Sequence, residues 1–126
     1  MTDARPPLSA FDDETFGHVA AETEVSADRL RTLVQRHQEG VRDLPGVDDI
    51  VYEWRNHFHM DPLLVRTDAV YVLALPGHVW EEFADRLDVS ETELDALLSV
   101  HDRQARALVD ATGRLDGDTA LVLIRP

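Results

Sequence analysis

Residues 83–98, FADRLDVSETELDALL, hold the pattern around which the rest of the fold is organised. The small residue Ala84, the turn Asp88-Val89-Ser90 and the apolar pair Leu94 and Leu97 are spaced as in two helices that meet at a sharp corner. Ser90 stands where a serine caps a helix, because its hydroxyl can accept a hydrogen bond from a free backbone N–H. The stretch therefore predicts one helix before Asp88 and another after Ser90.

The same pattern occurs 64 residues earlier in the chain. Between residues 15–44 and 79–108, eight of thirty positions are identical without a gap. The identical pairs are Ala20/Ala84, Val25/Val89, Ser26/Ser90, Leu30/Leu94, Leu33/Leu97, His37/His101, Arg42/Arg106 and Leu44/Leu108. One explanation is a duplicated helical hairpin whose copies pack about a pseudo-twofold axis. The other is that two Ser-capped amphipathic helices share leucines at the same offsets.

The hydrophobic periodicity predicts an α+β fold that is mostly helical. About five helices are expected near residues 12–23, 26–44, 47–60, 78–87 and 90–112, with Gly113 ending the last one and a turn at residues 116–118. Short apolar runs at 63–66 and 70–75 predict a hairpin, and 119–125 predicts a C-terminal strand of a small, mainly antiparallel sheet. Residues 1–10 are expected to be a disordered tail, and residues 11–126 one α+β domain.

The composition is strongly acidic. The chain of 126 residues has a formal net charge of -13, and all twelve of its basic residues are arginine. Such a chain repels itself at ordinary ionic strength, whereas molar salt screens charges to within about 3 Å. On this arginine-only, aspartate-rich composition the chain resembles small proteins of unknown function from halophilic archaea. The resemblance implies a salt-filled cytoplasm, where general acidity does not exclude a DNA partner.

Several classes of chemistry are excluded or not expected. The chain has no cysteine, so disulfides, thiolate nucleophiles and cysteine-ligated zinc are impossible. Its longest uncharged apolar stretch, residues 69–76, is far shorter than the roughly 20 residues of a membrane span. The sequence contains no GxSxG, HExxH or phosphate-binding glycine loop. We therefore expect a cytoplasmic protein without a cofactor or a membrane partner, and we do not expect an enzyme.

The histidines form one candidate metal site. His57, His59 and Asp61 stand close together in the sequence, and His78 and His101 could join them. Imidazoles and a carboxylate suit zinc or iron. Two histidines two positions apart on a helix point about 200° apart, so both could bind one ion only if the helix ends at His57. A histidine on an apolar helix stripe, as His101 is, more often belongs to the core.

Both copies of the repeated pattern resemble the helix-turn-helix of DNA-binding proteins. They depart from it at the turn, where glycine is usual and this chain has Glu24 in one copy and Asp88 in the other. The second copy begins with acids where a reading helix needs hydrogen-bond donors. The candidates for nucleic-acid contact are therefore in the first copy: Arg29, Arg31, Gln35 and Arg36.

The function expected from these patterns is association with another protein. The chain would act as a homodimer, an adaptor or a regulator, with the paired helical hairpins as the contact surface. The first alternative is a helix-turn-helix or winged-helix transcription regulator that binds DNA. The second is a metal-binding protein that uses His57, His59, His78 and His101.

Overall fold

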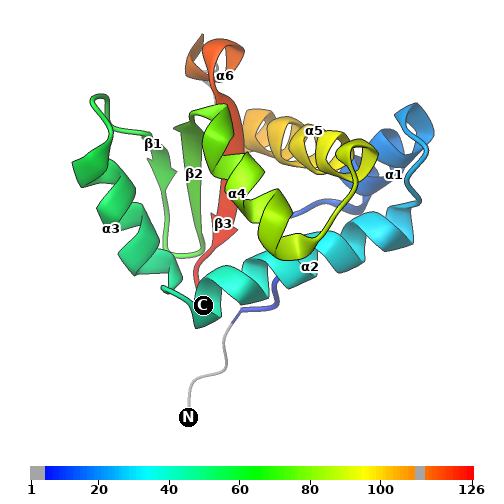
Figure 1. Cartoon of the computed structure of the whole chain (residues 1–126), viewed down its shortest axis with the longest axis horizontal. Coiled ribbons are helices and arrows are strands. Elements are labelled where there is room, and N and C mark those ends of the chain that lie inside the picture. Colours follow the sequence, from blue (N-terminus) through cyan, green and yellow to red (C-terminus); the bar gives the residue numbers. More distant parts are fainter. Residues whose placement is uncertain (1–4, 110–112) are drawn as a thin grey trace.

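The computed structural model describes residues 5–109 and 113–126. Within them the elements follow the order α1 (Asp13–Glu22), α2 (Ala27–Asp43), α3 (Val47–His57), β1 (Leu63–Arg66), β2 (Val70–Leu75), α4 (Gly77–Leu87), α5 (Glu91–Leu108), α6 (Gly113–Gly117) and β3 (Thr119–Ile124) (Figure 1). The mostly helical α+β fold expected from the sequence is confirmed. None of the helices in these residues is both long enough and apolar enough to span a membrane.

The three strands form one antiparallel sheet in the order β1-β2-β3. The predicted hairpin is present with the predicted residues, because two apolar runs flank a turn that Thr67 organises. The Thr67 hydroxyl oxygen accepts hydrogen bonds from the backbone N–H groups of Ala69 at 3.1 Å and Val70 at 3.0 Å. β2 is buried along its whole length and occupies the centre of the sheet.

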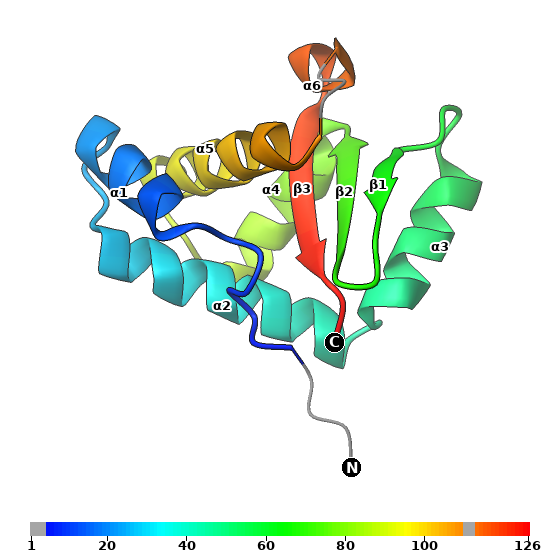
Figure 2. The ribbon, with the colours of Figure 1, turned by 180° about the vertical axis from the view of Figure 1, so that it is seen from behind.

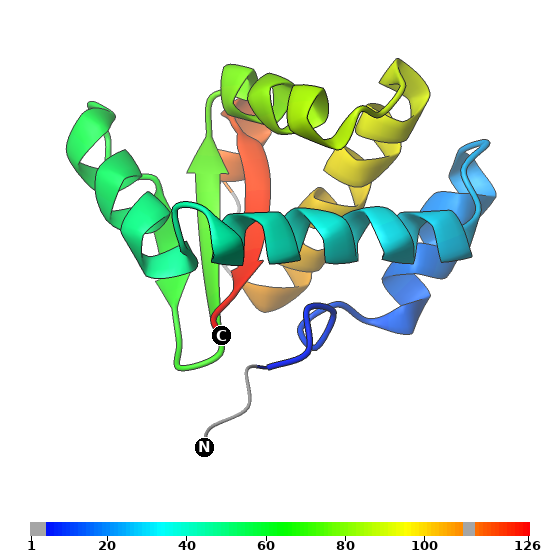
Figure 3. The ribbon, with the colours of Figure 1, turned by 60° about the horizontal axis from the view of Figure 1, so that its bottom comes forward.

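The helices are distributed around this sheet. α3 lies beside β1 at one end of the molecule, and α1 lies at the opposite end (Figures 1 and 2). α2 runs between these ends, packing against α1, α4 and α5 (Figure 3). α4 lies on one side of the strands, while α5 packs against β3. The two helical hairpins, α1–α2 and α4–α5, therefore meet each other next to β3.

β3 is an edge strand, although its continuous apolar sequence predicts a strand that is covered on both faces or central in the sheet. Buried helical side chains take the place of a fourth strand. Trp80 Nε1 donates to the Ala120 carbonyl at 3.1 Å, and the Val122 N–H donates to His101 Nδ1 at 3.0 Å. Gln38 Nε2 donates to the Val122 carbonyl at 2.7 Å, and the Ile124 N–H donates to Gln38 Oε1 at 2.9 Å. These bonds satisfy an edge that would otherwise be open to pairing.

Serine caps fix the start of α2 and of α5. Ser26 Oγ accepts from the Arg29 N–H at 3.1 Å, and Ser90 Oγ accepts from the Glu93 N–H at 3.1 Å. The Glu93 carboxylate in turn accepts a hydrogen bond from the Ser90 N–H, which completes a capping box. Asp88 has a φ of 54°, so the α4–α5 corner uses the left-handed conformation usual for glycine.

Several segments differ from the sequence-based expectation. α3 ends at His57 instead of near residue 60, and α5 ends at Leu108, short of the expected end at 112, with residues 110–112 outside the described part of the chain. Residues 113–117 form the short helix α6, where the expectation was the end of a helix followed by a turn. Residues 5–10, expected to belong to a disordered tail, form a turn in which the Phe11 N–H donates to the Leu8 carbonyl at 2.9 Å. Leu8 and Ala10 pack against the core, which holds this segment in place. Residues 1–4 lie outside the described part of the chain.

Candidate functional site

Residues that stand 64 positions apart face each other where the two helical hairpins meet. Arg29 Nε and Glu93 Oε2 form an ion pair at 2.7 Å, and the ring centroids of His37 and His101 are 5.7 Å apart. A residue that contacts its own counterpart lies near a twofold axis, as in a symmetric dimer. The packing agrees, because α1 lies against α5 as α4 lies against α2. A common origin of the two hairpins stays a prediction.

The two hairpin contacts differ at the position of Gln104. Gln104 of α5 is buried against α1, where its Oε1 accepts from the Thr15 hydroxyl at 2.9 Å and from the Asp12 N–H at 2.8 Å. The counterpart of Gln104, 64 residues earlier, is Gly40 of α2. A Cβ atom at Gly40 would meet no other atom within 4 Å. A side chain therefore fills the α1–α5 contact, whereas the α2–α4 contact is open at the equivalent place.

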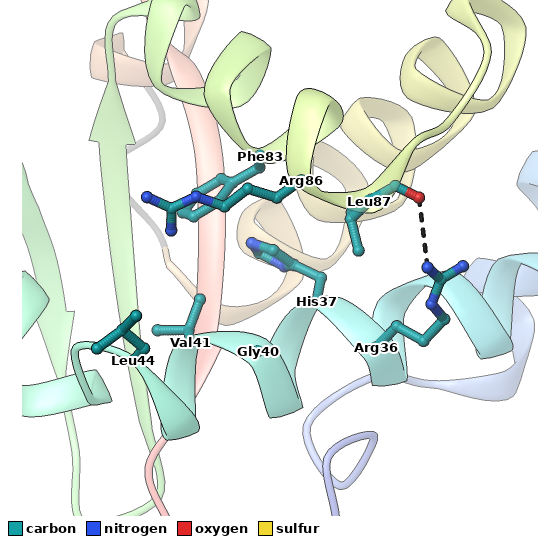
Figure 4. Close-up of a pocket in the computed structure, with 8 residues that line it drawn as sticks. All are labelled: Arg36, His37, Gly40, Val41, Leu44, Phe83, Arg86 and Leu87. Atoms are coloured by element: carbon teal, nitrogen blue, oxygen red, sulfur yellow. Dashed lines mark hydrogen bonds between the residues drawn. The ribbon is translucent and has the colours of Figure 1, made fainter.

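This opening is part of a pocket of about 430 Å³, which we call the α2–α4 groove (Figure 4). Its lining residues are Arg36, His37, Gly40, Val41 and Leu44 from α2 and its end, and Phe83, Arg86 and Leu87 from α4. Most of the lining is apolar, and the two arginines come from opposite sides of the groove. The volume is in the range of sites that hold a small ligand or an anchoring side chain.

Neither groove arginine is paired with an acid in the described part of the chain. Arg36 Nη2 donates to the Leu87 carbonyl at 3.4 Å, and the Arg86 side chain is exposed at the groove without such a contact. Arginines that do form ion pairs with carboxylates are Arg29, Arg31, Arg55, Arg103, Arg106 and Arg125. Arg5, Arg42 and Arg66 likewise form no ion pair within the described residues. Arg86, exposed at the groove with free donors, is available to an external anion.

The inner wall of the groove is uncharged. His37 is 3% exposed, and both of its ring nitrogens are buried without a hydrogen-bond partner in the described structure. Burial lowers the pKa of His37 to about 3. Burial, and secondarily the neighbouring His37, also lower the pKa of His101 well below its ordinary value. Both imidazoles are therefore neutral near pH 7, within an aromatic cluster that includes Trp80 and Phe83.

The residues proposed for a metal site are not brought together. α3 ends at His57, as the hypothesis requires, but His57, His59 and His78 are exposed, and Arg55 binds Asp61 through two nitrogens. His101 lies in the core, where its Nδ1 accepts from the Val122 N–H. In residues 5–109 and 113–126, no three metal-ligating side chains form a group that could hold an ion. We do not develop the metal hypothesis further.

The residues proposed for nucleic-acid contact are engaged with other parts of the protein. Arg29 pairs with Glu93, Arg31 pairs with Asp28, and Gln35 Nε2 donates to Glu39 at 3.0 Å. Arg36 is the exception, because it belongs to the α2–α4 groove. Neutralised arginines contribute little to phosphate binding, so these contacts weigh against the DNA alternative.

The sequence-based candidates miss Gly40, Phe83 and Arg86 of the groove. A glycine inside a helix and two residues on an amphipathic helix match no binding motif. The signal that could have identified the site is the alignment of the two hairpins, in which Gly40 stands opposite Gln104. Gly40 indicates an open site only because Gln104 fills the equivalent space in the other hairpin contact.

Comparisons with curated proteins and with solved structures gave no match. A family model described as a domain of unknown function, DUF8048, matches residues 9–125. The match includes both helical hairpins, the sheet and every residue of the α2–α4 groove. The chain therefore belongs to the DUF8048 family.

Proposed function

We propose that the protein is not an enzyme and acts by association with a partner protein through the α2–α4 groove. The observation that carries this proposal is the opening at Gly40, where the equivalent contact in the other half of the molecule is filled by Gln104. Because α2 belongs to the first helical hairpin and α4 to the second, the groove lies between the paired hairpins. It is thus part of the surface from which the sequence predicts association.

The presence of glycine at position 40 supports a binding role. A glycine inside a helix is less favourable than alanine by roughly 0.5–1 kcal/mol. Gly40 lies within α2 and has no positive φ that would require glycine, and space is available for a Cβ atom. Local stability therefore favours a larger residue, whereas an open groove favours glycine. Such a conflict is typical of binding sites.

The rim of the groove fits a partner protein better than a ligand that stays inside it. Leu44 lines the groove and is 73% exposed, so a molecule confined to the pocket would leave most of this side chain in water. A protein surface laid across the groove would cover it. Apolar anchors in a pocket with an exposed apolar rim are typical of protein interfaces.

Closing the groove is expected to abolish partner binding without loss of stability. Peptides selected from a random display library with the natural protein would be titrated against Gly40→Gln, which places at position 40 the residue of the other hairpin. We expect binding to fall by about tenfold or more, because the glutamine side chain would occupy the pocket. Gly17→Gln is the matched control, since Gly17 is also helical with open space around it.

In the same experiment, the free energy of unfolding of both variants should stay equal to that of the natural protein or rise, since each removes a helical glycine. Selected peptides that bind the natural protein and Gly40→Gln equally well would place the interface elsewhere. A library that yields no peptide above background would also count against the proposal.

We also propose that the protein works at high salt, as its resemblance to haloarchaeal proteins implies. The support is the net charge of -13, whose repulsion salt would screen. The helical circular dichroism signal is expected to grow as KCl is raised to about 2 M, and the midpoint of thermal unfolding should rise with it. Full helical signal and unchanged thermal stability in dilute buffer would contradict this. Sodium chloride at equal ionic strength separates charge screening from a specific potassium effect.

A further inference from the structure

The α2–α4 groove separates two kinds of chemistry. Val41, Phe83 and Leu87 provide apolar surface inside it, and Arg36 and Arg86 provide positive charge at its two sides. The exposed Arg86 side chain reaches across the groove from α4 toward Phe83, whereas the Arg36 guanidinium lies at the other end, where it donates to the Leu87 carbonyl (Figure 4). A bound group that satisfies both features needs an apolar part next to an anionic part.

The inner end of the groove restricts where a polar group can lie. The ring nitrogens of His37 are buried and face no hydrogen-bond partner in the described structure. The other side chains that line the interior are hydrocarbon or aromatic. A charge placed there would be desolvated without compensation, which is costly. The anionic group of a partner must therefore stay at the mouth, beside the arginines.

The acids around the groove do not neutralise these arginines. Glu39 precedes Gly40 and is the acid nearest to it in the sequence, and it accepts a hydrogen bond from Gln35 at 3.0 Å. No described carboxylate lies within ion-pair distance of either guanidinium group. A guanidinium binds a carboxylate through two parallel hydrogen bonds, and both groove arginines have donors left to do so.

A guanidinium with free donors beside an apolar floor fits an acidic residue next to a large apolar one. Resting on the function proposed above, we propose that the partner segment presents an aspartate or glutamate directly beside a large apolar side chain. Arg86 binds the carboxylate, and the floor formed by Val41, Phe83 and Leu87 receives the apolar side chain.

The test uses a pair of peptides that differ in one group. Both are blocked at their ends, and one carries a glutamate flanked by leucine and phenylalanine, whereas the other has glutamine at that place. Binding to the full chain is followed by NMR shifts of Gly40, Val41 and Leu87. We expect the glutamate peptide to bind about tenfold more tightly than the glutamine peptide, the ratio expected for a charge-assisted pair.

Two variants identify the cation. Arg86→Gln should remove most of the preference for glutamate, whereas Arg36→Gln, at the other end of the groove, should keep most of it. Both residues are exposed, so the variants should fold, and circular dichroism checks this. Arg103→Gln is the matched control, because Arg103 pairs with Glu22 outside the groove, and it should keep the full preference.

The outcomes separate this inference from the proposed function. If the two peptides bind equally well in the groove, the partner does not need a carboxylate, and the groove is still a binding site. Tighter binding of a phosphoserine counterpart, or of free hexanoate, would overturn it in favour of a phosphopeptide or a small acid. If neither peptide shifts the NMR signals of the groove residues but display-selected peptides do, the acidic partner segment is wrong and the groove is still a binding site. Failure of every peptide would overturn both.

Discussion

Replacing Gln38 by leucine is expected to lower the free energy of unfolding by about 2–6 kcal/mol. The variant keeps an apolar side chain of similar size but leaves the Val122 carbonyl and the Ile124 N–H without their partner. Each buried polar group that loses its hydrogen bond costs about 1–3 kcal/mol. Urea unfolding, followed by the fluorescence of the buried Trp80, would measure the change.

The matched control for this prediction is Gln35→Leu on the same helix. Gln35 is exposed and bonds only to Glu39, so its loss should change stability by less than about 0.5 kcal/mol. A Gln38→Leu variant as stable as the control would show that the outer edge of β3 does not depend on its helical partners.

Stability is expected to fall steeply as the pH is lowered from about 6.5 toward 3. The pKa of buried His37 is lowered from 6.5 to about 3, and that of His101 is also lowered, both chiefly by burial. Below pH 6.5 these histidines are protonated in the unfolded chain but stay neutral in the folded protein. The free energy of unfolding therefore falls by about 1.4 kcal/mol per pH unit for each histidine that is neutral when folded. At pH 4.5 His37 alone would remove about 3 kcal/mol, a large fraction of the stability of many domains, and His101 acts in the same direction.

Single variants assign this acid sensitivity to the histidine pair. His37→Leu should reduce the slope of stability against pH between 6 and 4.5 by about 1.4 kcal/mol per pH unit. Its stability at pH 8 should be unchanged or higher, because both ring nitrogens of His37 lack partners. His57→Leu, at an exposed position, is the control and should keep the slope of the natural protein. An unchanged slope in His37→Leu would mean that carboxylates cause the acid unfolding instead.

Much of the fold could be predicted because its signals are local. The hairpin has the predicted residues, since short apolar runs flank a turn, and Ser26 and Ser90 cap their helices as expected. α6 was missed because its terminal glycines, Gly113 and Gly117, are typical of helix ends and turns. Its helical turn depends on packing of the buried Leu115, which no local pattern reveals.

The position of β3 could not be predicted for a different reason. A continuous apolar run indicates burial but not what causes it. β3 is buried at the edge of the sheet because Gln38, Trp80 and His101 reach it from three helices. These contacts join residues far apart in the sequence, so each of the three matches an ordinary helix pattern. The same limit applies to the site, where Arg36 was proposed for DNA and Arg86 for no role.

The bonds to β3 also govern how this chain folds during synthesis. The hydrogen-bond partners of Gln38 lie 84 and 86 residues further along the chain, and the carbonyl that Trp80 binds lies 40 residues further along. None of these bonds can form before those residues have been synthesised. A ribosome that has released everything up to α5 has exposed both helical hairpins but none of the last strand. Contacts of such long range form late and slowly. Both hairpins therefore stay incomplete until β3 has left the ribosome, so a nascent chain stalled before Thr119 should remain open to proteases.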